Sequence, residues 1–171
     1  MKFVVGIGNP GREYDGTRHN IGFAVLDALG SVNGAKLVKP LTFVNRTGEE
    51  VLRLVQKNGA VAGDLLFVCD DVNLDFGKLR LRETGSAGGH HGLESVIEAL
   101  GVEDFSRLRF GVRTEDMPKD LTDFVLGKFS KEEEKRLKEM IARAAQVCRA
   151  WVEKGFEAAR LELSQLQSVQ E

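Results

Sequence analysis

A histidine and an asparagine occupy a glycine-rich stretch near the start of the chain. Residues 6–20 read GIGNPGREYDGTRHN and follow the apolar run Phe3–Val5. Glycine adopts backbone conformations that other residues resist, and proline fixes φ, so this composition predicts a shaped loop. Its chemically capable side chains include Asn9 and His19. A lone histidine in a loop is usually a surface or capping residue, and it becomes a candidate base when a partner fixes its tautomer.

Asp70 is the candidate partner. The apolar run Leu65–Cys69 predicts a buried strand that ends at Asp70. Asn9 follows the first predicted strand, and in open α/β sheets sites form where the carboxyl ends of strands meet. A carboxylate at this edge would accept a ring N–H from His19 and leave the other ring nitrogen free as a general base. The competing interpretation, which the residues leave open, is that Asp70 only starts a loop or caps a helix.

Other catalytic groups are poorly supported by the sequence. Cys69 precedes Asp70 and should point to the opposite face of the strand, toward the core. No GxSxG motif is present, and the three histidines, with His90 and His91 adjacent, do not have the usual spacing of a metal-ligand set. We therefore expect no cofactor and no metal, and we expect water to be the attacking group if the protein is a hydrolase.

The first glycines also match a dinucleotide-binding pattern. Residues 6–11 read GIGNPG, which fits GxGxxG after a strand. That motif requires the loop to run straight into a helix and an acidic residue to end the second strand. Here residues 12–17 are polar and loop-like, and no such acidic residue follows at the expected distance. The sequence therefore disfavours binding of NAD or FAD.

Basic residues alternate along two of the predicted strands. The alternation places cations on one face of each strand, at Lys78, Arg80 and Arg82 and at Arg107 and Arg109. Such cations usually form a solvated face. Near a glycine-rich loop they would also suit a phosphate backbone. The residues alone do not decide between these interpretations.

Predicted strands and helices alternate along the chain, which indicates one α/β domain with a sheet flanked by helices. Strands are expected at residues 2–7, 35–39, 65–69, 77–82 and 107–112, and helices at 21–29, from 47 to near 59, at 93–100 and from about 130 to 155. Two of these helices begin at predicted capping boxes, Thr47 with Glu50 and Ser130 with Glu133. The polar tail over residues 163–171 is expected to fray.

Composition limits the class of protein. The 171 residues suit one domain, and 42% hydrophobic and 29% charged residues are typical of a globular protein in water. No apolar run approaches the roughly 20 residues that span a bilayer. The two cysteines are far apart, so we expect a reducing, cytoplasmic environment. A net charge of −2 argues weakly against a nucleic-acid partner, although a local basic patch can override the total.

Four blocks of sequence together resemble bacterial peptidyl-tRNA hydrolases. They occur in order as GNPGREYDGTRHNIGF, KPLTFVNRTGE, DDVNLDFGKLRLRETGSAGGHHGL and DFVLGKF. The resemblance extends from Met1 to about Phe156, and the first block is highly specific. It implies a monomeric α/β domain with a twisted mixed sheet. It also implies cleavage of the ester between peptide and tRNA, so that peptidyl-tRNA would be the partner.

The resemblance also implies roles for individual residues. His19 matches the family's catalytic histidine, and Asp70 matches the aspartate that supports it. Asn9 and Asn45 match asparagines that position the peptidyl ester. Tyr14 corresponds to a tyrosine that lines the site.

Two arginines match residues that hold the tRNA phosphate, namely Arg82 and Arg109. The chemistry of an ester agrees with the analysis of the residues, since its leaving group is good enough for water activated by an imidazole. Neutral amide donors can stabilise the oxygen of a tetrahedral intermediate.

The chain departs from the family pattern in places. Between Gly30 and Lys36 this chain has a short turn where the family has the rest of the helix and an additional strand. His91 stands where the family usually has a substrate-contacting asparagine. The C-terminus lacks the usual aromatic–asparagine ending. These departures leave a second hypothesis, a non-catalytic RNA-binding relative with the same fold. The joint presence of His19, Asp70, Asn9 and Asn45 favours the enzyme, because a binding protein does not need a base.

Overall fold

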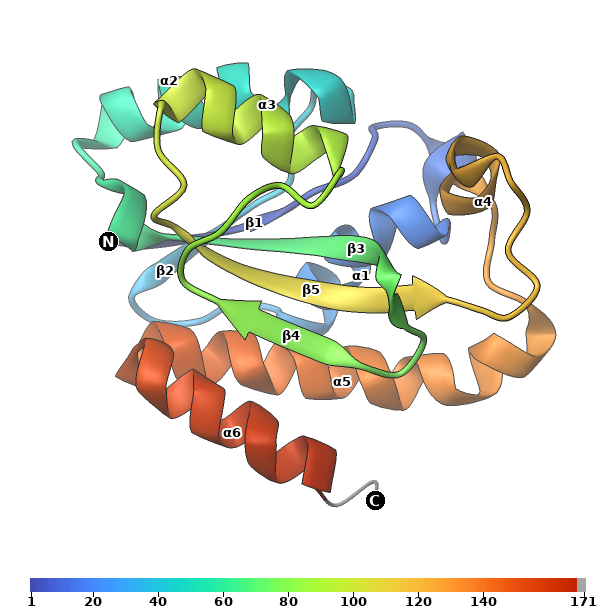
Figure 1. The fold of residues 1–171 in the computed structure, drawn as a ribbon. Coiled ribbons are helices and arrows are strands. Elements are labelled where there is room, and N and C mark those ends of the chain that lie inside the picture. The colour runs from blue at the N-terminus through green and yellow to red at the C-terminus, as the bar shows by residue number, and fades with distance from the viewer. Residues whose placement is uncertain (169–171) are drawn as a thin grey trace.

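The structure, a computed structural model, describes residues 1–168 and is built on a five-stranded mixed sheet (Figure 1). The strand order is β2-β1-β3-β5-β4, and only β4 runs antiparallel to its neighbour. The strands are β1 (Lys2–Gly6), β2 (Ala35–Val38), β3 (Leu65–Asp75), β4 (Leu79–Arg82) and β5 (Ser106–Arg113). The predicted α/β class with a mixed sheet is confirmed.

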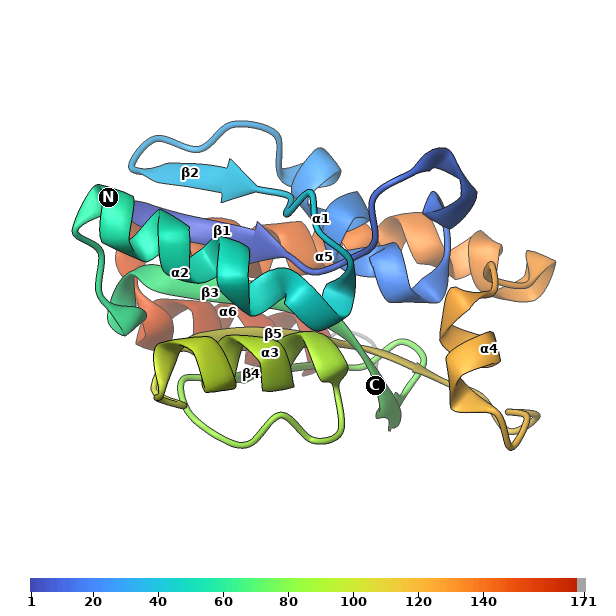
Figure 2. The same ribbon diagram turned by 90° about the horizontal axis from the view of Figure 1, so that it is seen from above.

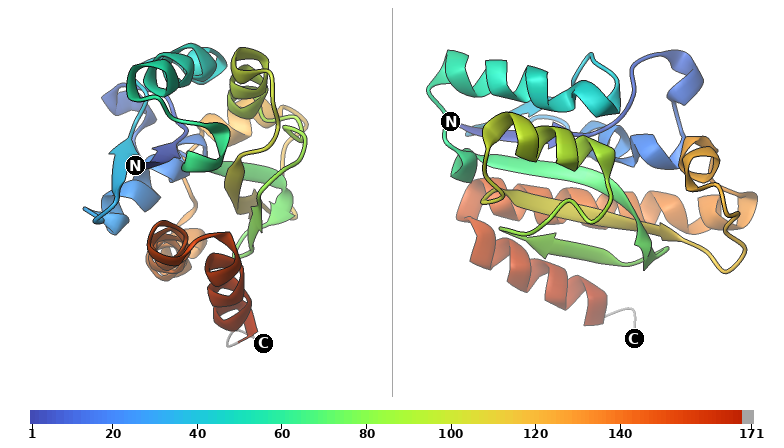
Figure 3. Two further views of the ribbon diagram at one scale, coloured as in Figure 1. Left: turned by 90° about the vertical axis from the view of Figure 1, so that its left-hand side faces the viewer. Right: turned by 45° about the horizontal axis from the view of Figure 1, so that its top comes forward.

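Helices cover both faces of the sheet (Figures 2 and 3). One face carries α1, α5 and α6, the other carries α2 and α3, and α4 lies beyond the ends of β3 and β5. The helices are α1 (Ile21–Leu29), α2 (Thr47–Asn58), α3 (His91–Leu100), α4 (Leu121–Leu126), α5 (Lys131–Lys154) and α6 (Phe156–Ser168). Three short 3₁₀ turns lie near the site: η1 (Arg12–Tyr14), η2 (Arg18–Asn20) and η3 (Val44–Arg46).

The hydrophobic core has two parts, one on each side of the sheet. Val4, Leu66 and Leu108 pack with α1 and α5 on one side, and Phe3 and Phe67 pack with α2 and α3 on the other. This division follows from strand geometry, because successive side chains point to opposite faces. A sheet covered on both faces is rigid and therefore suits the placing of side chains at its edge.

A close contact between α1 and the sheet fixes the start of that helix. A Cβ atom at Gly22 would lie 2.3 Å from the carbonyl oxygen of Val68 and 2.8 Å from the amide nitrogen of Ile7. Only glycine lets the helix approach the strands this closely. Because η2 immediately precedes α1, the contact also sets the position of His19 beyond the carboxyl end of β1 and beside Asp70 of β3.

Several predicted boundaries are confirmed. Helix α1 occupies the expected residues, and α2 and α5 end immediately before Gly59 and Gly155. The predicted capping box of α5 is present: Ser130 Oγ accepts from the Glu133 amide at 3.1 Å, and Glu133 Oε1 accepts from the Ser130 amide at 2.7 Å.

The predicted capping box of α2 is wrong. Turn η3 runs directly into α2, so Thr47 already has helical backbone angles and Arg46 is the capping residue. The hydroxyl of Thr47 is buried without a hydrogen-bond partner in the described structure, and Glu50 instead accepts from the amide of Leu41 at 2.8 Å.

Other elements differ from the prediction. Strand β3 continues to Asp75 because β5 keeps pairing with it, so Asp70 lies within the strand. Helix α4 was not predicted, because it is only six residues long. The tail predicted to fray is helical through Ser168, with Leu163 buried against the core, while residues 169–171 lie outside the described part of the chain. None of the helices over residues 1–168 is long and apolar enough to cross a membrane.

Candidate active site

His19 lies in η2, held next to the loop that follows β1. The Asn20 side chain makes two hydrogen bonds to this loop: Oδ1 accepts from the Asn9 amide at 2.8 Å, and Nδ2 donates to the Asn9 carbonyl at 2.9 Å. Asn20 is buried, so these bonds are shielded from water. They fix the spacing between the two residues that the sequence singles out, Asn9 and His19. Sequence reasoning missed Asn20, which makes these contacts as a side chain buried between the two segments.

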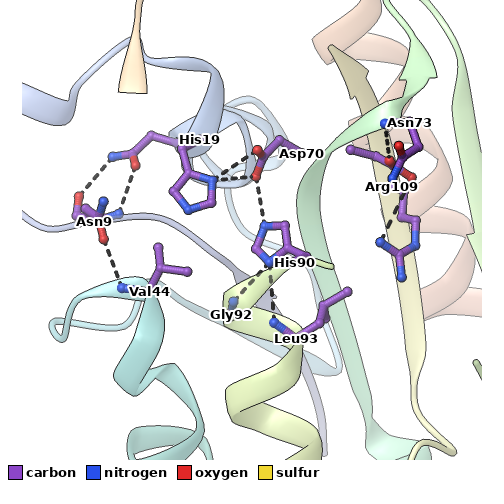
Figure 4. A network of polar contacts seen from close by, with 11 residues as sticks. Asn9, His19, Val44, Asp70, Asn73, His90, Gly92, Leu93 and Arg109 are labelled. Atoms are coloured by element: carbon purple, nitrogen blue, oxygen red, sulfur yellow. Dashed lines mark hydrogen bonds and ion pairs between the residues drawn. The ribbon is translucent and has the colours of Figure 1, made fainter. Parts of the chain in front are cut away.

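The Asp70 carboxylate holds His19 (Figure 4). His19 Nδ1 lies 2.9 Å from Asp70 Oδ1 and 3.0 Å from Oδ2. An ionised carboxylate only accepts hydrogen bonds, so Nδ1 carries the proton and donates it. Nε2 is then the unprotonated nitrogen of the neutral ring. The structure thus brings together the pair that the sequence proposes.

His90 is a second histidine on the same carboxylate. Its Nε2 lies 2.9 Å from Asp70 Oδ1, and its Nδ1 accepts from the amides of Gly92 at 3.1 Å and Leu93 at 3.4 Å (Figure 4). A ring nitrogen that accepts from backbone N–H groups has no proton, so His90 is neutral and donates through Nε2. His90 is therefore both the N-cap of α3 and a donor to Asp70.

Burial and charge act in opposite directions on the pKa values of this network. Burial alone would lower the pKa of His19, but the charge of Asp70 and its hydrogen bond outweigh burial, so the pKa lies above its usual value. Burial alone would raise the pKa of Asp70. The electrostatic attraction of the N–H groups of His19 and His90, together with their hydrogen bonds, prevails and holds the pKa of this carboxyl well below its usual range. Asp70 is therefore an anion at neutral pH.

A cavity of about 450 Å³ opens beside this network. His19, Asp70 and His90 lie in one wall, and α4 supplies an apolar wall through side chains that include Leu121, Val125 and Leu126. Such a mixture of apolar lining and a few convergent polar groups is typical of a small-molecule or peptide site. Thus the polar network borders a space that a substrate can enter.

The predicted asparagines both line this cavity. Asn9 is buried, and its Oδ1 accepts from the Val44 amide at 2.9 Å, which leaves Nδ2 as a donor without a partner among residues 1–168. Asn45 is exposed at the rim. Tyr14 does not line the cavity itself. Its ring packs edge-on against Phe43, a rim residue, with the ring centroids 5.9 Å apart.

The predicted arginines are in different places. Arg109 is buried beside the cavity, where it donates to the Ser86 carbonyl at 2.9 Å. Arg82 is exposed on β4 and lines a separate groove between β4 and α6. The antiparallel register sets Arg80, rather than Arg82, opposite Arg109. Arg107, opposite Arg82, is buried and donates to backbone carbonyls, including Gly85 O, so it supports the loop before α3.

His91 and Cys69 have opposite environments. The His91 side chain is 76% exposed at the cavity rim, and its Nδ1 lies 3.1 Å from Glu94 Oε2. Cys69 packs in the core with α2 and α3, as predicted, and burial raises the pKa of its thiol to about 12. The thiol is therefore a poor nucleophile.

The spacing of the histidines in the sequence does not indicate a metal site, but the fold brings three possible metal ligands together. The facing ligand atoms of His19, Asp70 and His90 lie within 4.8 Å of one another. In the present geometry both facing ring nitrogens donate N–H groups to Asp70. The arrangement is therefore organised as a hydrogen-bond network.

Comparison with known proteins identifies the family. The family model for peptidyl-tRNA hydrolase matches residues 3–37 and 30–170. The chain belongs to the peptidyl-tRNA hydrolase family. It is 42% identical over 180 residues to the peptidyl-tRNA hydrolase of Bacillus cytotoxicus, covering 91% of this chain and 95% of the relative. It is 41% identical over 177 residues to that of Halalkalibacterium halodurans, covering 91% and 96%.

Solved structures agree with this family assignment. The crystal structure of peptidyl-tRNA hydrolase from Acinetobacter baumannii superposes with a TM-score of 0.87 at 26% identity, covering 95% of this chain and 94% of that one. The two stretches matched by the family model overlap at residues 30–37. These residues are the connection between α1 and β2 together with the first three residues of β2.

Proposed function

We propose that this protein hydrolyses the ester of peptidyl-tRNA with a water molecule that His19 activates. Asp70 holds the His19 ring in the orientation that this requires. The observation that carries the proposal is the geometry of one ring: His19 Nδ1 is held at 2.9 Å from Asp70 Oδ1 while the ring lines the cavity. A histidine oriented in this way presents an unprotonated Nε2, which is what a general base requires.

The reaction needs only groups at this site. Nε2 of His19 takes a proton from water as the water oxygen attacks the ester carbonyl carbon. The resulting imidazolium is stabilised by the Asp70 carboxylate. When the bond between the carbonyl carbon and the ribose oxygen breaks, the imidazolium returns the proton to that oxygen. Free tRNA and the peptide's carboxylic acid leave, the acid then loses its proton to solvent to become the carboxylate, and His19 is neutral again.

Asn9 is the proposed donor to the carbonyl oxygen of the ester. Its amide cannot turn freely, because Oδ1 accepts from the Val44 amide and the Asn9 backbone is bound on both sides by Asn20. Nδ2 is thus a preorganised donor, which favours the charge that develops in the transition state. Asn45 at the rim is proposed to orient the peptide, and Tyr14 to support the rim through Phe43.

Arg82 and Arg109 are proposed to bind tRNA phosphates. Arg109 lies on β5 beside the cavity, and Arg82 lies on β4 in a separate groove, so the two would contact different phosphates. His91 is proposed to contact the substrate at the rim. We further propose that the protein acts as a cytoplasmic monomer and that the reaction needs no added metal.

The deciding experiment measures release of peptide from an N-blocked aminoacyl-tRNA by the purified protein in the presence of a chelator. Release with turnover supports the hydrolase. Binding of the tRNA without release would instead support the non-catalytic RNA-binding alternative. The oriented His19 favours the enzyme, since binding alone gives no reason to hold a neutral imidazole on a buried carboxylate.

A further inference from the structure

Arg18, the residue before His19, joins the catalytic segment to α4. Its guanidinium donates from Nη2 to Glu133 Oε1 at 2.8 Å and from Nη1 to the Phe124 carbonyl at 3.2 Å. The guanidinium carbon also lies 4.1 Å from the centre of the Phe124 ring. With the Arg18 and Glu133 side chains only 11% and 8% exposed, these contacts are partly shielded from water and are stronger than surface pairs.

Arg18, Phe124 and Glu133 thus form a junction between η2, α4 and α5, and backbone contacts add to it. The Arg18 amide donates to the Gly127 carbonyl at 3.0 Å, and Thr17 pairs with Lys128 in an isolated antiparallel bridge. Thus η2 is attached to the end of α4 through both its backbone and the Arg18 side chain.

Helix α4 contacts the junction and the cavity with different residues. Phe124 is buried on Arg18, whereas Leu121, Val125 and Leu126 line the cavity. A short helix of six residues has little stability of its own, so its place depends on such contacts. The distance between the apolar wall and His19 is therefore set by the junction.

Glu133 anchors the other end of the junction. Its Oε1 accepts from the Ser130 amide as well as from Arg18, so the capping box of α5 also fixes the guanidinium. Because α5 is a long helix packed in the core, Arg18 connects the short helix α4 to a firmly packed element. Loss of the arginine side chain would remove its contacts with Phe124 and Glu133 and leave only the backbone contacts between η2 and the end of α4.

We propose that Arg18 is a positioning residue, which holds α4 as the apolar wall of the cavity at a fixed distance from His19 and so sets how the peptide end of the substrate is seated. This inference rests on the proposed function for its kinetic part. The structural part, that Arg18 holds α4, is independent of the activity.

The test compares Arg18→Met, Arg18→Lys and a matched control, Arg149→Met. Arg149 also joins helices, since its Nη2 donates to the Leu29 carbonyl at 3.0 Å, but it lies outside the cavity lining. Hydrogen exchange of the α4 amides is measured against that of α3. Steady-state kcat and KM are measured with N-blocked leucyl-tRNA and glycyl-tRNA, well below the melting temperature of each variant.

Arg18→Met should speed α4 exchange by about tenfold or more while α3 exchange is unchanged, because the opening is local. It should lower kcat/KM by about tenfold for the leucyl substrate and by less for the glycyl substrate, which makes fewer apolar contacts. Arg18→Lys should have smaller effects on α4 exchange and on kcat/KM than Arg18→Met, since lysine keeps a positive charge facing Glu133. Arg149→Met should change thermal stability alone.

Parent-like α4 exchange in Arg18→Met would overturn the inference, whether or not the protein is active. Equal losses on both substrates that match those of Arg149→Met would also overturn it, because they would indicate a general structural role. If the parent protein released no peptide at all, the proposed function would fail, and the exchange data would still decide whether Arg18 holds α4.

Discussion

His90 and Asp70 are joined by a partly buried hydrogen bond of 2.9 Å between Nε2 and Oδ1, the same oxygen that lies 2.9 Å from His19 Nδ1. Backbone amides at the start of α3 fix the tautomer of His90, so its donor role is set by the helix. The carboxylate therefore has two donors of different kinds. One is the proposed base, and the other is a structural ring that keeps Asp70 in place.

Replacing Asp70 tests the charge beneath the base. Asp70→Asn removes the negative charge that raises the pKa of His19, so this pKa should fall. Since neutral His19 is the active form, the acidic limb of kcat/KM should move to lower pH, and the rate on the plateau should also fall because the imidazolium loses its stabilising partner. The pH–rate profiles of parent and variant measure both effects. An unchanged limb and plateau would show that Asp70 does not act on His19.

His90→Leu should shift the same limb in the opposite direction. Removing the N–H donor leaves the Asp70 anion less neutralised, so its effect on His19 grows and the pKa of His19 rises further. The variant also loses the cap of α3, which should cost about 1 kcal/mol of stability. His90→Asn is the matched control, because asparagine can cap the helix. If the acidic limb of kcat/KM moved to lower pH in His90→Leu, this would contradict the tautomer assigned to His90, in which Nε2 carries the proton.

Part of this site could be predicted from sequence, because its signals are local. The glycine-rich loop, the apolar run that leads to Asp70 and the polarity of Asn9 are all visible in single segments. His90 could not be assigned, since its role depends on the start of α3 meeting β3, a contact between segments distant in sequence. A local signal did exist: a histidine immediately before a predicted helix can act as its cap.

The same distinction applies to the fold. Long apolar or amphipathic segments such as α1 and α5 were predictable, and so was the cap at Ser130. The short helix α4 was not, because six residues give only a weak sequence pattern, even though Asp120 caps the helix. The partner of Arg109 depends on the register between β4 and β5, which the alternation of cations does not reveal.

Replacing Arg82 and Arg109 together should weaken tRNA binding and flatten its salt dependence. Each lost phosphate contact should reduce the slope of log K against log salt by roughly one. Arg82→Ala alone is the cleaner probe, because Arg109 also holds the Ser86 carbonyl. A minimal ester without the tRNA body should be hydrolysed nearly normally. Equal losses on tRNA and minimal ester would indicate misfolding instead of lost phosphate contacts.

His91→Asn tests whether the rim histidine contacts the substrate. A neutral imidazole offers one donor and one acceptor, as a side-chain amide does, but a protonated imidazole offers only donors. If His91 contacts substrate, His91→Asn should keep the parent activity at pH 7.5 and exceed it near pH 5.5. The two kinetic profiles across this range provide the comparison. Superimposable profiles, together with an indifferent His91→Ala, would remove His91 from the site.

The most direct test of the account is the turnover of His19→Ala with its tRNA affinity measured in parallel. The imidazole activates water and adds little to binding, so kcat should fall by about 10²–10⁴-fold, the usual contribution of a general base. The dissociation constant for tRNA should stay within about twofold of the parent, as expected when a group acts only in the transition state. A variant that kept more than about a tenth of the parent kcat would contradict the assignment of His19 as the base.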